Sequence, residues 1–406
     1  MKIYKNKILI IGDAGVNTGF SRVIQSIFLR VCNHYELHQL ATHYNGEPHS
    51  GKWKLYPAKS EADPYGYALI PGMIKSLQPD IVFIIYDLIY QVEYLKVLNS
   101  CNGHFKVAIY SPLESGPIAP EIGMGLKGVS AFAVYTDYAL GEMNDCIAKI
   151  RADDPQFQFP DIKVIPHAVD TQLFYPIIPA AGDTRQVAAR KILFDGDEEL
   201  VDSFLFLNAN RNQPRKAIDI SMEAFAIFAK DKPANVRLFM HMAVQDRGWN
   251  IPIMAKRLGI YERLVMMSLD NTLPTADEET LNLIYNSCDV GFTTSTGEGW
   301  GLVSFEHAAT GTAQIVPAHT ALKEIWTGSA EMVAPSFRLT YPGNLTHAWI
   351  VKPEDVAQAM ENLYSDAVYR QQVADKCYAV SQNEAYDWDR IAERWDEIFR
   401  ELLLFN

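Results

Sequence analysis

Several features that mark special classes of protein are missing from this chain of 406 residues. No run of about eighteen apolar residues occurs, so the sequence predicts no membrane-spanning helix. Residues 1–7 lack the apolar core of a secretory signal peptide, and we therefore expect a cytoplasmic protein. Low-complexity tracts and internal repeats are also absent, which excludes the repeat architectures.

Metal-binding patterns are absent as well. The five cysteines are scattered, odd in number and without ligand spacing: Cys32, Cys101, Cys146, Cys288 and Cys377. We expect reduced, mostly structural thiols, as is usual in the cytoplasm. The ten histidines show no H-E-x-x-H or other ligand spacing, so no metal site and no metal cofactor is predicted. His167, in the stretch 165–170, is interpreted as a structural loop residue rather than a catalyst.

Positive charge is in short supply. The net charge of −13 argues against general adhesion to nucleic acid or membranes. Residues 1–170 hold 15 lysines and arginines against 17 acids, whereas the remainder holds 21 against 32. The first part of the chain is thus nearly neutral and leaves room for a local basic face.

The pattern of apolar residues predicts an α/β protein with two domains. The chain is too long for one ordinary core, and short apolar runs alternate with amphipathic segments, which is typical of parallel sheets with crossover helices. Helices are expected at residues 20–32, 217–230 and 278–286, and a turn-rich surface loop at 45–66. Strands are expected at 7–12, 81–86, 107–110, 131–135 and 163–166, then at 204–208, 236–241, 264–268, 290–294 and 314–316.

A Pro- and Gly-bearing stretch at 174–182 suits the linker between the domains. We predict two Rossmann-like, doubly wound domains at 1–175 and 176–380 that face each other across a cleft, because ligands bind at the carboxyl ends of such strands. Residues 381–406 are predicted as a C-terminal helix, with Trp388, Ile391 and Trp395 among the apolar residues at helical spacing. Periodicity alone does not say which domain this helix covers.

The run from Gly297 to Glu306 carries the strongest functional pattern. It places Glu298 and Glu306 eight residues apart, with glycines around the first and an apolar helical pattern carrying the second. Such a sequence suits a sharp turn after a strand and then a helix whose free N–H groups can face a phosphate. The two carboxylates can accept hydrogen bonds from hydroxyls. A phosphate beside several hydroxyls describes a nucleotide-sugar.

Two other loops are candidates for phosphate contacts. The strand at 204–208 runs into a loop with Arg211, Arg215 and Lys216, and fixed cations at a strand end would suit a diphosphate leaving group. Taken alone, these cations are more often solvated loop charges. The loop at 12–22 leads into a helix, where a glycine backbone can approach a phosphate. It lacks the full dinucleotide fingerprint, so an ordinary turn without a ligand is an equally good interpretation. Arg22 is a candidate phosphate contact or an exposed helix charge.

Taken together, these motifs resemble the retaining GT-B glycosyltransferases of family 4. The resemblance covers nearly the whole chain and is strongest from 163 to 316, with 164–174 similar to the family's passage between domains. Arg211 and Lys216 match the R-x4-K pair, which the resemblance implies grips the donor diphosphate. Glu298 and Glu306 match the E-x7-E element, whose first acid contacts the transferred sugar and whose second holds the ribose.

The resemblance also implies further donor contacts. The amides of Gly301, Leu302 and Val303 would lie near the phosphates, and Gly19 is the phosphate-facing glycine of the first loop. Backbone around Leu273 would contact the base. The C-terminal helix would return to the first domain.

The chain departs from the family at one place. Many members carry a histidine after a mid-domain strand, where this chain has Tyr110-Ser111-Pro112-Leu113-Glu114. Glu114 or Ser111 is expected to take over a sugar contact, and this departure leaves the identity of the donor sugar open.

We therefore expect a metal-independent, retaining glycosyltransferase that takes a UDP-sugar or GDP-sugar. The sequence does not identify the hydroxyl acceptor and leaves a glycan, a protein and a modified nucleic acid open. The alternatives are a GT-B epimerase or phosphorylase, or a sensor that binds nucleotide-sugar without turnover. A two-domain solute-binding protein is disfavoured by the missing signal segment.

Overall fold

The structure, a computed structural model, describes residues 5–15, 18–47, 49, 51–58, 62–267 and 276–404. The chain divides into two compact units. Unit 1 comprises Met1–Ala168, Asn344–Thr346 and Ala385–Asn406, and unit 2 comprises Val169–Gly343 and His347–Glu384.

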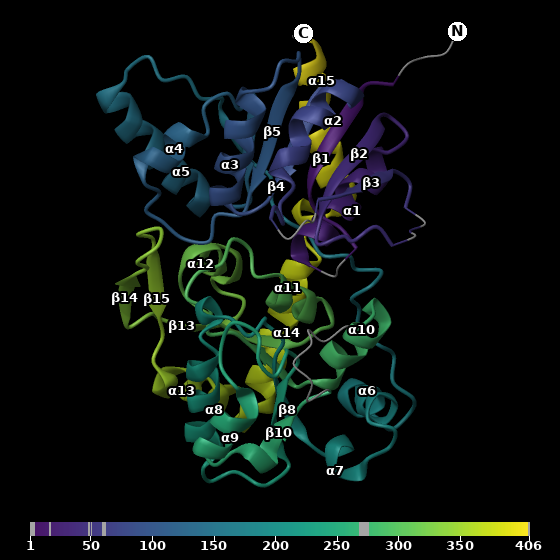
Figure 1. The fold of residues 1–406 in the computed structure, drawn as a ribbon. Helices are drawn as coiled ribbons and strands as arrows, with labels where there is room; N and C mark the ends of the chain where they lie inside the picture. Colours follow the sequence, from purple (N-terminus) through teal and green to yellow (C-terminus); the bar gives the residue numbers. More distant parts are fainter. Residues whose placement is uncertain are drawn as a thin grey trace. The chain divides into compact units, whose positions relative to one another are not determined.

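Unit 1 is built on a parallel sheet of seven strands (Figure 1). Its order is β3-β2-β1-β4-β5-β6-β7, which places β1 and β4 at the centre. Both strands are rich in isoleucine and buried along almost their whole length, as expected for strands covered on two faces. The strands are β1 (Lys7–Asp13), β2 (Glu36–Thr42), β3 (Lys54–Pro57), β4 (Ile81–Ile85), β5 (Lys106–Ser111), β6 (Ala131–Val134) and β7 (Ile162–Val164). The helices are α1 (Gly19–Val31), α2 (Ile70–Leu77), α3 (Leu88–Asn99), α4 (Pro120–Gly125) and α5 (Asp137–Asp153).

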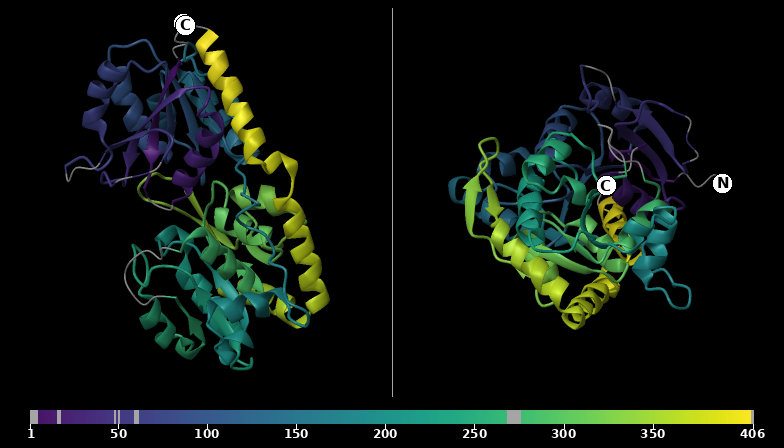
Figure 2. Two further views of the ribbon diagram at one scale, coloured as in Figure 1. Left: turned by 90° about the vertical axis from the view of Figure 1, so that its right-hand side faces the viewer. Right: turned by 90° about the horizontal axis from the view of Figure 1, so that it is seen from below.

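The C-terminal helix α15 (Trp388–Leu404) belongs to unit 1, as the resemblance implied (Figure 2). Its apolar face is buried. The Trp395 ring is fully buried and lies 4.9 Å from the ring of Phe83 and 5.1 Å from that of Tyr110. Phe399 stacks on Phe28 of α1 at 5.9 Å. The last helix therefore completes the core that the first strands begin.

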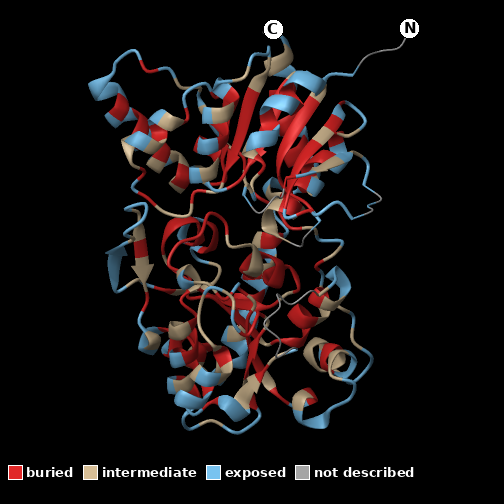
Figure 3. Cartoon of the chain, viewed as in Figure 1, coloured by how far each residue is buried: buried red, intermediate tan, exposed pale blue. Residues whose placement is uncertain are grey.

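Unit 2 repeats the plan with a six-stranded parallel sheet of order β10-β9-β8-β11-β12-β13. In both units the sheets form the buried centre (Figure 3). The strands are β8 (Phe204–Asn208), β9 (Val236–Met240), β10 (Leu264–Val265), β11 (Val290–Phe292), β12 (Ala313–Pro317) and β13 (Glu331–Val333), with a separate antiparallel hairpin of β14 (Phe337–Thr340) and β15 (His347–Ile350). The helices are α6 (Arg185–Leu193), α7 (Glu198–Val201), α8 (Ile218–Ala229), α9 (Ile251–Arg257), α10 (Glu278–Ser287), α11 (Leu302–Ala309), α12 (Thr320–Trp326), α13 (Pro353–Ser365) and α14 (Ala367–Ser381).

The prediction of two Rossmann-like domains is confirmed, and most strands lie where the apolar runs indicated. Five strands were not predicted from the sequence: β2, β3, β13, β14 and β15. Strand β3 falls within the predicted loop at 45–66; it is short, lies at the sheet edge and ends in a proline, which suits an edge. Strand β14 is exposed at every residue, so burial imposes no alternation on it.

The chain passes into unit 2 after Ala168, whereas the boundary predicted from the sequence is at 175. The structure shows why the chain joins unit 2 before residue 175. The backbone N–H of Tyr175 donates to Asn282 Oδ1 at 3.2 Å, and that of Ile177 donates to Asn286 Oδ1 at 3.0 Å. Both asparagines lie on α10, so the start of the Pro-rich stretch is held on unit 2. Among the described residues, no helix is both long and apolar enough to span a bilayer.

We expect Trp395→Ala to lower the free energy of unfolding by about 3–5 kcal/mol, because it empties a buried site packed by three rings. Leu404→Ala on the same helix is the matched control, since Leu404 is 80% exposed and its truncation should change stability by less than about 0.5 kcal/mol. Denaturant unfolding of the two variants measures the difference. Equal effects would contradict the assignment of α15 to the core of unit 1.

Candidate functional site

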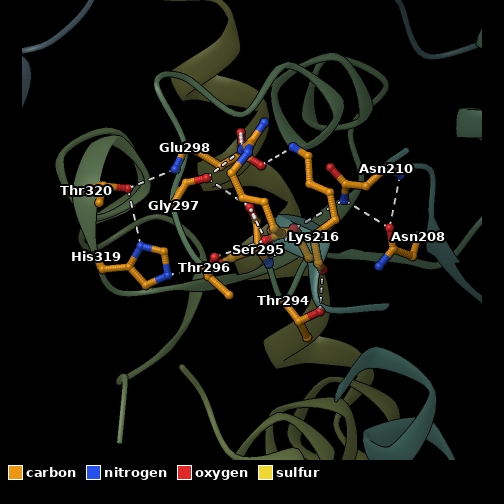
Figure 4. A network of polar contacts seen from close by, with 12 residues as sticks. Asn208, Asn210, Lys216, Thr294, Ser295, Thr296, Gly297, Glu298, His319 and Thr320 are labelled. Atoms are coloured by element: carbon orange, nitrogen blue, oxygen red, sulfur yellow. Dashed lines mark hydrogen bonds and ion pairs between the residues drawn. The ribbon is translucent and has the colours of Figure 1, made fainter. Parts of the chain in front are cut away.

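The candidate site lies in unit 2, where the carboxyl ends of β8, β11 and β12 meet at one edge of the sheet. This is the edge at which doubly wound folds bind ligands. Three loops leave these strands: 209–217, 293–301 and 318–319. Each contributes polar side chains to one hydrogen-bonded network (Figure 4).

Glu298 is the centre of this network. Its carboxylate forms an ion pair with Lys216 Nζ, and its other oxygen accepts from Arg215 Nη1 at 3.1 Å. The side chain of Glu298 is only 8% exposed, and that of Lys216 is 12% exposed. Arg215 also donates to the carbonyl of Gly297 at 2.6 Å, so one guanidinium binds both the backbone and the side chain of this loop.

The electrostatics keep Glu298 ionised. Burial acts to raise the pKa of its carboxyl, but the charges of Lys216 and Arg215 outweigh it. Hydrogen bonds from Lys216 and Ser295 add to this effect, and the pKa of Glu298 falls to about 2. The site therefore presents a fixed carboxylate and two cations together in a place that contains little water.

The loops after β8 and β11 are tied to each other by the backbone. The Thr296 N–H donates to the Arg215 carbonyl at 2.8 Å, and the Thr294 hydroxyl donates to the Ala217 carbonyl at 2.8 Å. Ala217 has a positive φ of 45° and turns the chain into α8 directly after Lys216. These contacts fix where Lys216 stands relative to Glu298.

A histidine and a threonine hold the same loop from the β12 side. His319 Nε2 lies 2.9 Å from the Ser295 carbonyl oxygen, and the Glu298 N–H donates to Thr320 Oγ1 at 3.2 Å. Burial lowers the pKa of His319 to about 4, although the Ser295 carbonyl and the charge of Glu298 act in the opposite direction. The ring is therefore neutral near pH 7.

Helix α11 begins beside Glu298. Gly301 has φ +91°, and a Cβ there would meet Leu322 Cδ2 at 2.6 Å, so the turn into the helix requires glycine. Leu302 and Val303 are the first helical residues, whose N–H groups precede the intrahelical ladder. Glu306 lies one turn along and is buried; its carboxylate accepts from the Tyr285 hydroxyl at 2.9 Å.

Arg211 is placed differently from the other cations. Its guanidinium is half-exposed and pairs with Asp246 at 2.9 Å, whereas Lys216 pairs with Glu298. Arg215 is the second cation on Glu298, although from the sequence it was only one of three loop cations. Its place directly before Lys216 was the available sequence signal. Leu273 lies outside the described residues.

The four remaining predicted residues lie in unit 1, two of them in helix α1 after β1 and two at or just beyond the end of β5. Gly19 is the first residue of α1, capped by Thr18, whose hydroxyl binds the buried carboxylate of Asp13 at 2.7 Å. Arg22 follows in the first turn. Ser111 ends β5 fully buried, and among the described atoms its Oγ has no hydrogen-bond partner. Glu114 is half-buried in the loop beyond it.

Comparison with known proteins supports the fold. No protein-family model matches the chain. A D-inositol 3-phosphate glycosyltransferase of Geodermatophilus obscurus is 33% identical over 156 residues, which are 38% of this chain and 32% of that protein. The chain thus matches about a third of this relative's length.

Two solved structures are similar over nearly their whole length. Sucrose-phosphate synthase of Thermosynechococcus elongatus has a TM-score of 0.74 at 14% identity, with 99% of this chain and 100% of that chain covered. HepE of Anabaena in complex with UDP-glucose has a TM-score of 0.70 at 13% identity, with 97% and 99% covered. At these identities the likeness shows the fold, which is that of the GT-B glycosyltransferases.

We expect Glu298→Gln and Lys216→Met each to destabilise unit 2, since each leaves a buried partner without its counter-charge. In a double-mutant cycle the coupling should be on the order of 1–3 kcal/mol. The exposed pair Glu93 and Lys96 on α3 is the control and should couple by less than about 0.5 kcal/mol. A coupling at 216/298 as small as the control's would show that the pair is solvated.

We also expect stability to fall on acidification from pH 7 to pH 5. Burial lowers the pKa of His307 to about 3, helped by the charge of Arg185, and burial lowers that of His319 to about 4. The unfolded chain takes up these protons near pH 6.5, the folded chain only well below it. Stability is therefore complete above pH 6.5 and declines below it, by on the order of 1–2 kcal/mol per histidine at pH 5.

Denaturant unfolding at the two pH values measures this loss. His307→Asn should make the decline shallower, whereas the same change at exposed His104 should leave it unaltered. A stability that is the same at pH 5 and pH 7 would be inconsistent with neutral, buried imidazoles.

Proposed function

We propose that this chain is a glycosyltransferase that moves a sugar from a nucleoside-diphosphate-sugar to a hydroxyl acceptor. One observation carries the proposal. A buried, ionised Glu298 stands with Lys216 and Arg215 at the carboxyl edge of the unit 2 sheet, directly before the start of α11. Carboxylates bind hydroxyls, and cations with helix N–H groups bind phosphates. The arrangement therefore suits a ligand that carries both.

Lys216 is proposed to stabilise the departing diphosphate. Negative charge builds on the leaving group as the glycosidic bond breaks, and a fixed cation in a dry site acts on that charge most strongly. Arg211 is proposed as its partner. The guanidinium of Arg211 is half-exposed in its ion pair with Asp246, so it is accessible to a phosphate.

The two acids have separate proposed roles. Glu298 would accept hydrogen bonds from hydroxyls of the donor sugar, and Glu306 would accept from the ribose. The N–H groups of Gly301, Leu302 and Val303 would face the phosphates. We also propose five further residues as donor contacts: Gly19, Arg22, Ser111 and Glu114 of unit 1, and Leu273.

For the stereochemistry we propose retention. The acceptor hydroxyl attacks the anomeric carbon on the face that the diphosphate leaves, and the leaving phosphate oxygen takes the hydroxyl's proton. The C–O bond to the acceptor forms as the C–O bond to the diphosphate breaks, so the step balances without a protein base. Lys216 and Arg211 would supply the positive charge, so we also propose that no metal ion is required.

UDP-glucose is the first donor to test, because HepE was solved with it and has the same fold. A GDP-sugar is the other donor we expect. The acceptor would be a hydroxyl of a glycan, a protein or a modified nucleic acid. A thermal-shift screen of nucleoside diphosphates and their sugars identifies the donor, because a ligand that binds only the folded state raises its apparent stability.

Lys216→Met should lower turnover of the identified donor by about 10²–10³-fold, as expected for the loss of a charge that stabilises a leaving group. Lys191→Met is the matched control, because Lys191 is exposed and pairs with Asp183 at the surface. Product formation is followed by mass spectrometry. Equal turnover in both variants would remove Lys216 from the reaction.

Saturating EDTA should leave the rate of transfer, or of slow donor hydrolysis, within about twofold of the untreated rate, since the proposed charge stabilisation comes from side chains. Readdition of Mg²⁺ or Mn²⁺ is the control. Loss of activity with EDTA and recovery with metal would contradict the metal-independent mechanism. A protein that binds donor tightly, yet neither transfers nor hydrolyses it with any acceptor class, would instead be a sensor.

A further inference from the structure

Thr320, the first residue of α12, has an unusual backbone conformation. Its φ is +46°, in the left-handed region. A β-branched residue is a genuine outlier there, because its side chain crowds the backbone in that conformation. Strain of this kind persists only where surrounding contacts over-determine it, and it clusters at functional sites.

The contacts of Thr320 show what holds it. Its Oγ1 accepts the Glu298 N–H at 3.2 Å and lies 3.2 Å from His319 Nδ1. His319 Nε2 lies 2.9 Å from the Ser295 carbonyl. A carbonyl oxygen can only accept, so Nε2 carries the proton of the neutral ring and Nδ1 is left as an acceptor. The Thr320 hydroxyl therefore donates to Nδ1 and accepts from Glu298.

These two residues thus bind both ends of one short loop. His319 binds the carbonyl of Ser295 at its start, and Thr320 binds the N–H of Glu298 at its end (Figure 4). The middle of the loop is held elsewhere. The Thr296 carbonyl accepts from the Trp349 N–H at 2.9 Å, and the Gly297 carbonyl accepts from Arg215. The loop at 295–298 is buried throughout.

We propose that Thr320, acting with His319, is a positioning residue that sets the Glu298 carboxylate for the donor sugar and so makes the site prefer a sugar nucleotide over the bare nucleotide. The inference rests on the proposed function, because it takes Glu298 as the group that binds the sugar. Lys216 and Arg215 bind the carboxylate of Glu298. The Thr320 hydroxyl accepts a hydrogen bond from the backbone N–H of the same residue.

A purely structural role predicts a different pattern. If the Thr320 hydroxyl served only the fold, its removal would lower the melting temperature without altering the preference between a sugar nucleotide and the bare nucleotide. Helix α12 gives no support for a capping role, because no side-chain cap hydrogen bond to its N-terminus is found among the described residues. The contacts of the hydroxyl are to Glu298 and His319.

Two variants separate these roles. Thr320→Val keeps the branched shape and removes the hydroxyl, whereas Thr320→Ser keeps the hydroxyl and removes the branch. Binding of UDP, UDP-glucose, GDP and GDP-glucose is measured by calorimetry. We expect Thr320→Val to weaken the sugar nucleotide about tenfold, with the matching nucleoside diphosphate changed by less than about twofold. Thr320→Ser should keep the wild-type ratio.

Hydrogen exchange of the peptide that contains 295–298 gives a readout that needs no ligand. Exchange should be faster in Thr320→Val and unchanged in Thr320→Ser, because the Glu298 amide loses its acceptor only in the first. Equal weakening of both ligands, or an unchanged ratio and unchanged exchange, would overturn the proposal. If Thr320→Val does not fold, Thr320→Ala replaces it, since it also lacks the hydroxyl and carries less strain.

Failure of the proposed function gives a distinct result. In that case the wild-type protein binds none of the four ligands, while the exchange experiment still decides whether Thr320 holds the loop.

Discussion

The candidate site depends on one interaction, the ion pair between Lys216 and Glu298 in a place that water barely reaches. Each charge would be costly to bury alone, so each fixes the other's position. Arg215 adds a second positive charge and binds the backbone of the same loop. Two loops that are more than eighty residues apart in sequence are thereby joined, and the ends of β8 and β11 act as one surface.

The backbone around this pair is strained in two places. Ala217 and Thr320 both have positive φ values, and they stand directly after Lys216 and His319. Neither residue type favours that conformation, so packing and hydrogen bonds must impose it. A site that keeps such strain is held in one geometry by its surroundings, so it does not have to adopt that geometry when a ligand binds. This rigidity is what a fixed electrostatic environment requires.

The fold could largely be predicted from the sequence, because isoleucine-rich runs such as β1 and β4 are fully covered and leave little choice of structure. Strands β3 and β14 could not, because an edge or exposed strand has no buried face to reveal its period. At the site, the spacing of the two carboxylates indicated Glu298 and the family resemblance indicated Lys216, and the structure brings these two residues together. Nothing in the sequence indicated Thr320, because its left-handed backbone conformation is imposed by surrounding contacts and not by its residue type.

Unit 1 draws its core from both ends of the chain, and this affects how the protein is made. Ribosomes deliver all of unit 2 before α15 emerges. Until then Phe28, Phe83 and Tyr110 lack the aromatic cover of Trp395 and Phe399. Unit 1 therefore receives the last part of its core only after unit 2 has been synthesised, and until then its sheet exposes an apolar surface that α15 later covers.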